Sequence, residues 1–126
     1  MTSSSEQWME QAQYDLETAR SMLASKRLLY VLFCCQQAVE KALKSVIVRK
    51  TGEFPPRVHN LMRLAELAAA NLPTEQVDFL RELSFYYIQS RYPDEIENIG
   101  QRISHDLARD VLEKTERTIE WLHSIP

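Results

Sequence analysis

Residues 29–50, LYVLFCCQQAVEKALKSVIVRK, decide the fold, because their apolar side chains recur at the three- and four-residue spacing of one α-helix face. The members of this repeat are Leu29, Leu32, Phe33, Val39, Leu43, Val46 and Ile47. The basic segment Ser25-Lys26-Arg27 precedes the repeat and Thr51-Gly52 follows it, and a glycine in that position is typical of a helix end. We therefore expect one long helix here, with its apolar face in the core.

Apolar repeats on both sides of this segment predict the remaining helices. Their expected ranges are residues 5–24, 59–71, 74–89 and 102–123. Ser3 and Glu6 have the spacing of a capping box before the first helix, and Thr74 is placed to cap the fourth. The segment after Pro93, within residues 91–101, is expected to be a loop. Short connections favour antiparallel neighbours, so we expect an all-α fold, an up-and-down antiparallel helical bundle of four to five helices.

The composition excludes several classes of protein. The 126 residues are 44% hydrophobic and 26% charged, which is typical of a soluble globular protein, and we expect a single domain over residues 1–126. Only 2 glycines occur, too few for the turns of a many-stranded sheet. A net charge of −3 provides no general attraction for nucleic acid, so any such contact must be local.

The sequence also predicts where the protein resides. No apolar run reaches the ~20 residues that a membrane-spanning helix needs. Residues 1–7 are polar and lack the basic and apolar regions of a secretory signal. We expect a cytoplasmic protein that does not cross a membrane.

The common signatures of metal sites and enzymes are missing from the sequence. The histidines, His59, His105 and His123, form neither an H-x-x-x-H pair nor an HExxH motif, so we assign no metal ligand and no cofactor. Cys34 and Cys35 point about 100° apart on a helix, which makes a disulfide between them geometrically poor. Glycines at positions 52 and 100 cannot form a glycine-rich phosphate loop, and no G-x-S-x-G nucleophile motif occurs. We therefore assign no catalytic residue and favour a binding protein over an enzyme.

Two polar residues lie within or beside the apolar arc of the central helix. On a helical wheel with Leu43 at zero, Gln36 falls at about 20° and Glu40 at about 60°. In one interpretation Glu40 pairs with Lys44 one turn later and Gln36 bonds a neighbouring helix. In the other, a pocket or self-association face crosses this end of the bundle, and Glu40, Lys41 and Lys44 supply its charges.

Aromatic and charged residues gather at the expected end of the fourth helix, in the segment YYIQSRYPDE at 86–95. One interpretation is structural: Arg91 complements the helix C-terminus while Tyr92 and Asp94 take part in the turn. In a second, the guanidinium of Arg91 binds a phosphate while a tyrosine ring stacks on a base. In a third, tyrosine and arginine side chains anchor a protein interface.

His59 is a further candidate, because it follows the rigid connector Pro55-Pro56-Arg57 at the expected start of the third helix. A lone histidine at a helix start is commonly a cap or a packed ring. Its alternative role is that of a binding-site residue.

Four motifs together resemble the HEPN domain family. They are Asp15-Leu16, FCCQQAVEKALK at 33–44, His59-Asn60-Leu61 after the double proline, and Arg91-Tyr92-Pro93-Asp94. Their order and spacing match over nearly the whole chain, and the helix motif combined with RYPD is far more specific than either piece alone. The resemblance implies an all-α bundle of about five helices that commonly forms a homodimer. It further implies a nucleotide-binding role, and prokaryotic members often sit beside a minimal nucleotidyltransferase as a toxin–antitoxin pair.

Many members of the family that this chain resembles are metal-independent ribonucleases. They use an arginine and a later histidine with four to six residues between them, and both residues lie in a cleft at the dimer interface. After Arg91 the corresponding positions hold Ile96, Glu97 and Asn98, so this chain lacks that histidine. The resemblance is therefore to an RYPD-bearing branch without the ribonuclease motif.

Our leading hypothesis is a homodimeric binding module that binds a nucleotide or RNA and works with a nucleotidyltransferase. Its binding residues would be Glu40, Lys41, Lys44, His59, Arg91, Tyr92 and Asp94. A second hypothesis is a ribonuclease with an irregular site, in which His59 or His105 replaces the missing histidine. A third is a plain dimerisation scaffold, whose interface anchors would be Tyr86, Tyr87 and Tyr92.

Overall fold

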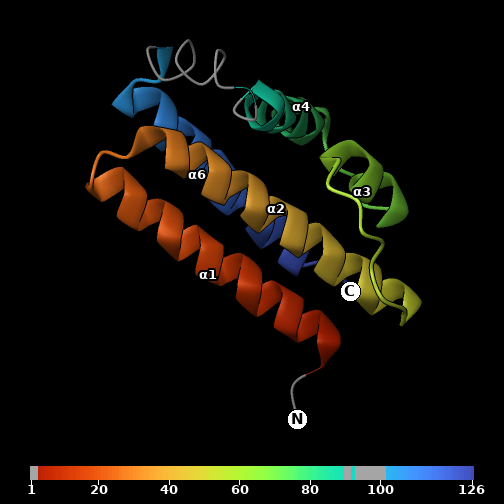
Figure 1. Cartoon of the computed structure of the whole chain (residues 1–126). Helices are drawn as coiled ribbons and strands as arrows, with labels where there is room; N and C mark the ends of the chain where they lie inside the picture. The colour runs from red at the N-terminus through yellow and green to blue at the C-terminus, as the bar shows by residue number, and fades with distance from the viewer. Residues whose placement is uncertain (1–2, 90–91, 93–101) are drawn as a thin grey trace.

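Figure 1 shows the protein as a computed structural model, which describes residues 3–89, 92 and 102–126. The helices are α1 (Ser4–Ala24), α2 (Leu28–Thr51), α3 (Leu61–Leu67), α4 (Thr74–Gln89) and α6 (His105–His123). No strand occurs in the described ranges, and the expected all-α helical bundle is confirmed. The loop expected at 91–101 lies outside the described residues, except for Tyr92.

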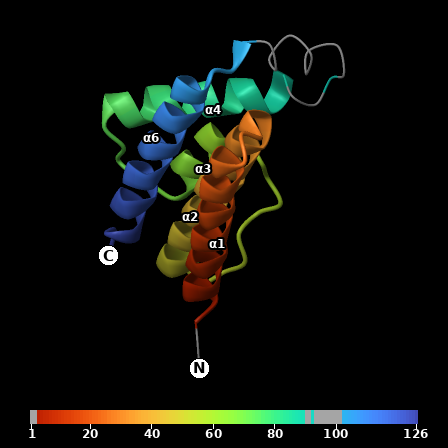
Figure 2. The ribbon, with the colours of Figure 1, turned by 90° about the vertical axis from the view of Figure 1, so that its left-hand side faces the viewer.

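Three long helices, α1, α2 and α6, lie side by side, and α2 contacts each of the other described helices (Figure 1). α1 runs in the opposite direction to α2 and α6. α2 and α6 run in the same direction, and the chain passes through α3 and α4 between them. Figure 2 shows α4 lying across one end of these long helices. α2 is therefore the central element, and its surroundings determine what the candidate site residues contact.

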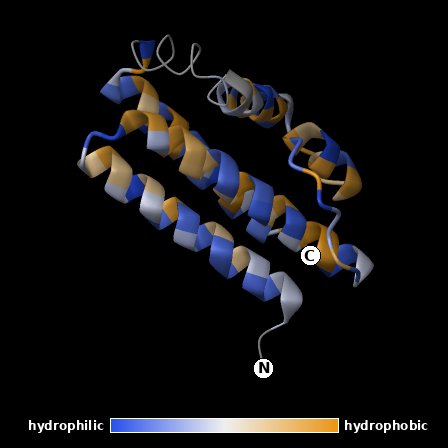
Figure 3. Ribbon diagram, in the orientation of Figure 1, coloured by the Kyte–Doolittle hydropathy of each residue, from blue (hydrophilic) through white to orange (hydrophobic). Residues whose placement is uncertain are grey.

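The burial pattern follows from this arrangement. α2 carries long hydrophobic stretches, whereas α1 is mainly hydrophilic (Figure 3). Most members of the predicted repeat on α2 are buried in the core: Leu32, Val39, Leu43, Val46 and Ile47. α6 buries one face only, with apolar residues Ala108, Val111, Leu112, Ile119 and Leu122. The helical periodicity thus predicts the core side of α2 correctly.

Local hydrogen bonds define several helix ends. The Glu6 N–H donates to Ser3 Oγ over 3.1 Å, which confirms the predicted cap of α1. α2 ends at Gly52, whose φ of 72° lies in the left-handed region and whose N–H donates to the Val48 carbonyl. The Leu107 N–H donates to Ser104 Oγ over 3.0 Å, so α6 begins at His105, three residues later than predicted.

The helices between α2 and α6 differ from the prediction in two details. α3 covers Leu61–Leu67 only, because the Asn60 side chain caps its start and Ala69 already has a φ of 48°. Thr74 is the first residue of α4 rather than its cap, and the Pro73 carbonyl accepts the first backbone hydrogen bonds. Both differences concern ends, where the apolar repeat carries little information.

Two further expectations can be compared with the structure. Cys34 and Cys35 are free, and the two thiols form no disulfide with each other. Among the described residues, none of the helices combines the length and the apolar character needed to span a membrane.

Candidate functional site

A polar cluster lies on α2 beneath the connector to α3. Its centre is Glu40, which is only 4% exposed, and Lys44 beside it is 7% exposed. Lys44 Nζ donates to Glu40 Oε2 over 3.1 Å, one helical turn away. The predicted Glu40–Lys44 pair is therefore confirmed, and it is a buried ion pair rather than a surface one.

His59 joins this cluster from the connector. Its Nδ1 lies 3.1 and 3.2 Å from the two carboxylate oxygens of Glu40, while its side chain is 61% exposed. Because a carboxylate only accepts hydrogen bonds, Nδ1 carries the proton and the ring is held in one orientation. The neutral ring then has Nε2 as an acceptor, and the protonated ring has it as a second donor. His59 is the part of this cluster that reaches solvent.

Gln36 stabilises the backbone at His59. Its Nε2 donates to the His59 carbonyl over 3.4 Å and makes a longer contact of 3.5 Å with Glu40 Oε1. The expectation that Gln36 bonds a neighbouring helix is wrong, because its partners lie on α2 itself and on the connector. Gln36 Oε1 is buried and has no hydrogen-bond partner among the described residues.

The lysines of the cluster are also engaged by α1. Lys44 Nζ lies 5.4 Å from the centroid of the Trp8 ring, within range of a cation–π contact. Lys41 Nζ forms an ion pair with Asp15 Oδ2 at 2.8 Å. Glu40, Lys41 and Lys44 thus all have intramolecular partners. The structure brings Glu40, Lys44 and His59 together, whereas Lys41 pairs with Asp15 on α1, and only His59 is mostly exposed.

Sequence reasoning missed the α1 members of this cluster. Trp8 has no role in the sequence analysis, and Asp15 enters it only through the family resemblance. Their contacts depend on how α1 packs against α2, which no spacing within either helix reveals. The one indication of these contacts in the sequence was the Asp15-Leu16 motif, which the family resemblance groups with the motif at 33–44.

The second candidate region is the aromatic end of α4. Tyr86 and Tyr87 lie against Leu29, Leu32 and Phe33 at the start of α2. The Tyr86 hydroxyl donates to Glu82 Oε2 over 3.4 Å. Burial raises the pKa of the Tyr86 phenol, and the nearby Glu82 carboxylate raises it further. These tyrosines therefore have packing roles within the chain.

Tyr92 is 60% exposed, so its ring is available for stacking or for an interface. Arg91 and Asp94 lie outside the described residues. Their predicted roles therefore stay predictions.

The two candidate regions lie on one side of the molecule. Phe33 and Gln36 are three residues apart on α2, which corresponds to about 5 Å along the helix axis. In Figure 2 the connector from α2 to α3 and the C-terminal end of α4 lie on the same side of the long helices. We call this side, defined by His59, Tyr86 and Tyr87, the His59 side.

The other reactive groups in the described ranges do not form a site. Burial raises the pKa of the Cys35 thiol from 9.0 to about 12, and burial together with Asp15 raises that of Cys34. Both thiols therefore stay protonated near neutral pH and are poor nucleophiles. His105 Nδ1 faces Arg109 Nη2 at 3.0 Å and is exposed. Within the described part of the chain, no group of three or more metal-binding side chains converges.

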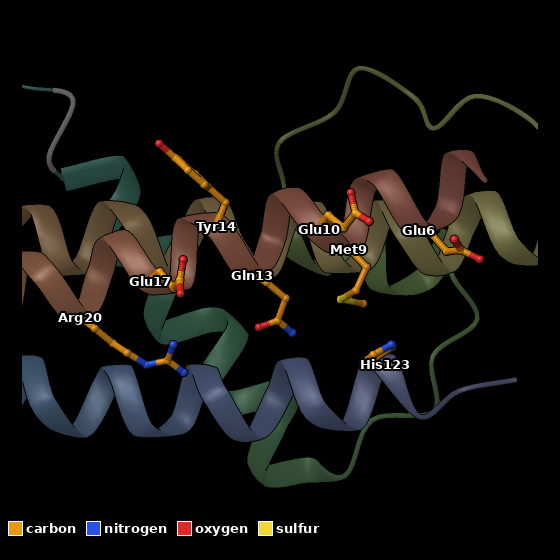
Figure 4. Close-up of a pocket in the computed structure, with 8 residues that line it drawn as sticks. All are labelled: Glu6, Met9, Glu10, Gln13, Tyr14, Glu17, Arg20 and His123. Atoms are coloured by element: carbon orange, nitrogen blue, oxygen red, sulfur yellow. The ribbon is translucent and has the colours of Figure 1, made fainter. Parts of the chain in front are cut away.

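A groove of about 530 Å³ lies along α1 beside the end of α6 (Figure 4). It is lined by Glu6, Met9, Glu10, Gln13, Tyr14, Glu17, Arg20 and His123. None of the predicted site residues lines it, and its carboxylates oppose the binding of a phosphate. The groove is therefore a poor candidate for a nucleotide site.

Sequence comparison supports the family assignment. The HEPN domain family matches residues 5–125, nearly the whole chain. The chain belongs to the HEPN domain family. The crystal structure of TT1696 from Thermus thermophilus is similar to this HEPN chain, with a TM-score of 0.78 and 23% sequence identity. The similarity covers 94% of this chain and 95% of TT1696, and it shows a shared fold. No curated protein matches this HEPN chain.

Proposed function

We propose that this HEPN chain is a cytoplasmic binding module, a single domain over residues 1–126 that acts as a homodimer. On the His59 side it binds the phosphate of a nucleotide, and it works with a minimal nucleotidyltransferase in a toxin–antitoxin-like pair. The observation that carries the proposal is the exposed His59 ring, oriented by the buried carboxylate of Glu40.

The chemistry of phosphate recognition fits this side of the molecule. A protonated imidazole held at Nδ1 presents its Nε2–H to an anion, and a guanidinium binds phosphate oxygens in a bidentate way. Arg91 supplies the guanidinium in this proposal, and the exposed ring of Tyr92 supplies a stacking surface for the base. Asp94 belongs to the same proposed site.

Glu40, Lys41 and Lys44 take a supporting role in this proposal. Glu40 orients His59, and Lys44 balances the buried charge of Glu40. Lys41 ties α2 to α1 through Asp15. These residues position the binding group and do not themselves contact the ligand.

The nucleotide part of the proposal can be tested by thermal unfolding with ATP and GTP. Binding at 100 times Kd stabilises a folded protein by about 2.7 kcal/mol, which raises its Tm measurably. We expect the wild type to show this shift, and His59→Ala and Arg91→Ala to lose it. The unliganded His59→Ala protein should fold, because Glu40 keeps its ion pair with Lys44.

His105→Ala is the matched control, because His105 is exposed on α6 and does not contact Glu40. It should keep the nucleotide-dependent shift. A wild type whose Tm does not respond to either nucleotide would remove nucleotide binding from the proposed function.

The partner can be identified by affinity capture of the tagged protein from its host lysate. We expect a nucleotidyltransferase-like protein to be recovered, and to be recovered less well with Arg91→Ala. Recovery of this chain alone would contradict the two-component role.

A second candidate function, a ribonuclease, is favoured by the same Glu40–His59 pair. When Nδ1–H donates a hydrogen bond to a carboxylate, Nε2 of the neutral ring is free to accept a proton from a ribose 2′-hydroxyl. The 2′-oxygen then attacks the adjacent phosphorus, the bond to the 5′-oxygen breaks, and that oxygen is protonated by water. Within the described residues, His105 Nδ1 faces Arg109 and no carboxylate, so His59 is the better candidate for the base.

RNA cleavage in the presence of EDTA distinguishes this function from binding alone. The ribonuclease candidate predicts cleavage by the wild type and by His105→Ala, and its loss in His59→Ala. Cleavage that persists in both histidine variants would exclude this mechanism.

A further inference from the structure

The groove along α1 has no part in the proposed nucleotide site, although it is a hollow of about 530 Å³. Figure 4 shows it running between α1 and α6, with Met9 and Gln13 on one side and His123 on the other. Met9 is only 5% exposed and provides an apolar floor, and Tyr14, which is 66% exposed, extends the apolar surface along α1. A groove of this kind between two helices is a surface on which a third helix can pack.

Unpaired carboxylates line the α1 side of the groove. Glu6, Glu10 and Glu17 are separated by one helical turn and then by two, so they follow one face of α1. All three are exposed, and none forms an ion pair with another described residue. Their charges are therefore available to a cationic partner.

α6 adds negative charge along the other side of the groove. Its Glu116 forms a 3.2 Å ion pair with Arg20 of α1, so the guanidinium in the groove wall is already engaged. Glu116 and His123 are seven residues apart and share one face of α6, on which Glu113 and Glu120 also lie. Because the whole chain has a net charge of only −3, this groove concentrates much of its negative charge.

We propose that the groove along α1 binds a basic amphipathic helix of another protein. Lysine or arginine side chains of that helix pair with Glu6, Glu10 and Glu17, and its apolar side chains pack on Met9 and Tyr14. The inference is independent of nucleotide binding, which the proposed function places on the His59 side.

The spacing of the carboxylates favours a helix over a small cation. Glu6 and Glu17 are eleven residues apart, which corresponds to about 16 Å along the helix axis. In the part of the chain that the structure describes, no three metal-binding side chains converge, so a single metal ion does not match this row. Basic side chains one and two turns apart on a partner helix repeat at the same intervals as the carboxylates.

The apolar floor favours an amphipathic helix over a purely polar polycation. The Met9 side chain is flexible and adapts to apolar groups of different shape. The Tyr14 ring offers an apolar face and a polar hydroxyl, a combination that is enriched at protein interfaces. The apolar stripe of an amphipathic helix covers both side chains, whereas a polyamine leaves them in water. A nucleic acid is opposed by the carboxylates, because its phosphates carry the same charge.

Fluorescence anisotropy with the full chain tests this inference. The probe is a labelled amphipathic peptide of lysine and leucine, about 18 residues long so that it can form a helix. We expect it to bind, and to bind more weakly as salt is raised. A peptide with serine in place of leucine, and spermine, should each bind about 10-fold more weakly because they lack the apolar stripe. A peptide with glutamate in place of lysine should not bind.

Charge reversal locates the binding surface. Glu10→Lys combined with Glu17→Lys should weaken probe binding about 10-fold or more, because each substitution replaces an attraction with a repulsion. Glu53→Lys combined with Glu75→Lys is the matched control. It makes the same change of net charge at exposed carboxylates outside the groove, which also form no ion pair within the described ranges. Circular dichroism should show that both variants are folded.

The His123 ring resonances locate the probe on the wild type, so this measurement does not depend on the folding of any variant. The probe should shift the His123 ring in a saturable way and leave the His59 ring unchanged. No binding at about 100 μM, which corresponds to a Kd far above the micromolar range, or a shift confined to His59, would overturn the inference.

Equal weakening by the two charge reversals would also overturn it, because binding would then need only negative charge. Equal binding of the serine peptide or of spermine would exclude an amphipathic helix as the occupant. Each of these outcomes leaves nucleotide binding at His59 standing, since that site is tested with ATP and GTP.

Discussion

At the scale of single residues, the buried Glu40–Lys44 pair has the largest expected effect on stability. Burying two charges is costly, and their mutual attraction offsets this only when both partners remain. His59 and Gln36 add hydrogen-bond donors to the carboxylate, and Trp8 lies against the ammonium group. Each charge therefore depends on the other for its burial.

Glu40→Ala should lower the free energy of unfolding by about 3–5 kcal/mol, because it leaves the Lys44 ammonium buried without a counter-ion. Urea unfolding measures this loss. The double variant Glu40→Gln with Lys44→Met should recover much of it, since no unpaired charge remains. Arg20→Ala breaks the exposed pair with Glu116 and serves as the control, with a loss below about 1 kcal/mol. A loss of that small size for Glu40→Ala would contradict the account of the cluster.

Cys35 should make stability depend on pH in the alkaline range. Burial raises its pKa from 9.0 to about 12 in the folded protein, so the folded state holds this proton more tightly than the unfolded state. The stabilisation is complete below pH 9 and is lost progressively as the pH rises toward 12.

Comparison with Cys35→Ala isolates this contribution from that of other groups. Above pH 9 the wild type should lose about 1.4 kcal/mol more per pH unit than the variant. Urea unfolding at pH 8, 9, 10 and 10.5 checks this slope. A stability difference between the two proteins that does not change with pH would show that the Cys35 thiol is not buried as described.

At the scale of elements, the apolar repeat predicts where helices occur but not where each one ends. The central helix and its buried side follow from the periodicity of residues 29–50, and the structure confirms them. The ends depend on single hydrogen bonds, as at Ser104, and on backbone conformation, as at Ala69. A prediction based on periodicity therefore places α3 and the start of α6 inaccurately.

Gly52 is the residue on which the end of α2 depends. Its φ of 72° is favourable for glycine, and a Cβ added there would contact nothing within 4 Å. Gly52→Ala should therefore cost about 1 kcal/mol, from backbone strain alone. Gly52→Asn should cost less, because asparagine tolerates this conformation better. Thermal unfolding of the two variants measures the difference, and equal Tm values for alanine and glycine would contradict the explanation.

At the scale of the whole molecule, α2 connects the fold with the candidate site. The Glu40–Lys44 pair was predictable because both residues lie on one helix, one turn apart. The contact of His59 with Glu40 was not, because it requires the connector to fold back over α2. The Asp15–Lys41 pair likewise depends on the packing of α1 against α2. Sequence reasoning thus named most of the cluster but left open whether its charges pair within the chain or face a pocket.

This arrangement leads to the central claim, that nucleotide binds on the His59 side and not in the groove along α1. The ring resonances of two histidines distinguish these sites, because His59 contacts Glu40 and His123 lines the groove. The direct measurement is an NMR titration of the histidine ring resonances with ATP and with GTP. We predict that the His59 ring shifts in a saturable way while the His123 ring does not. A shift confined to His123, or no shift with either nucleotide, would contradict the claim.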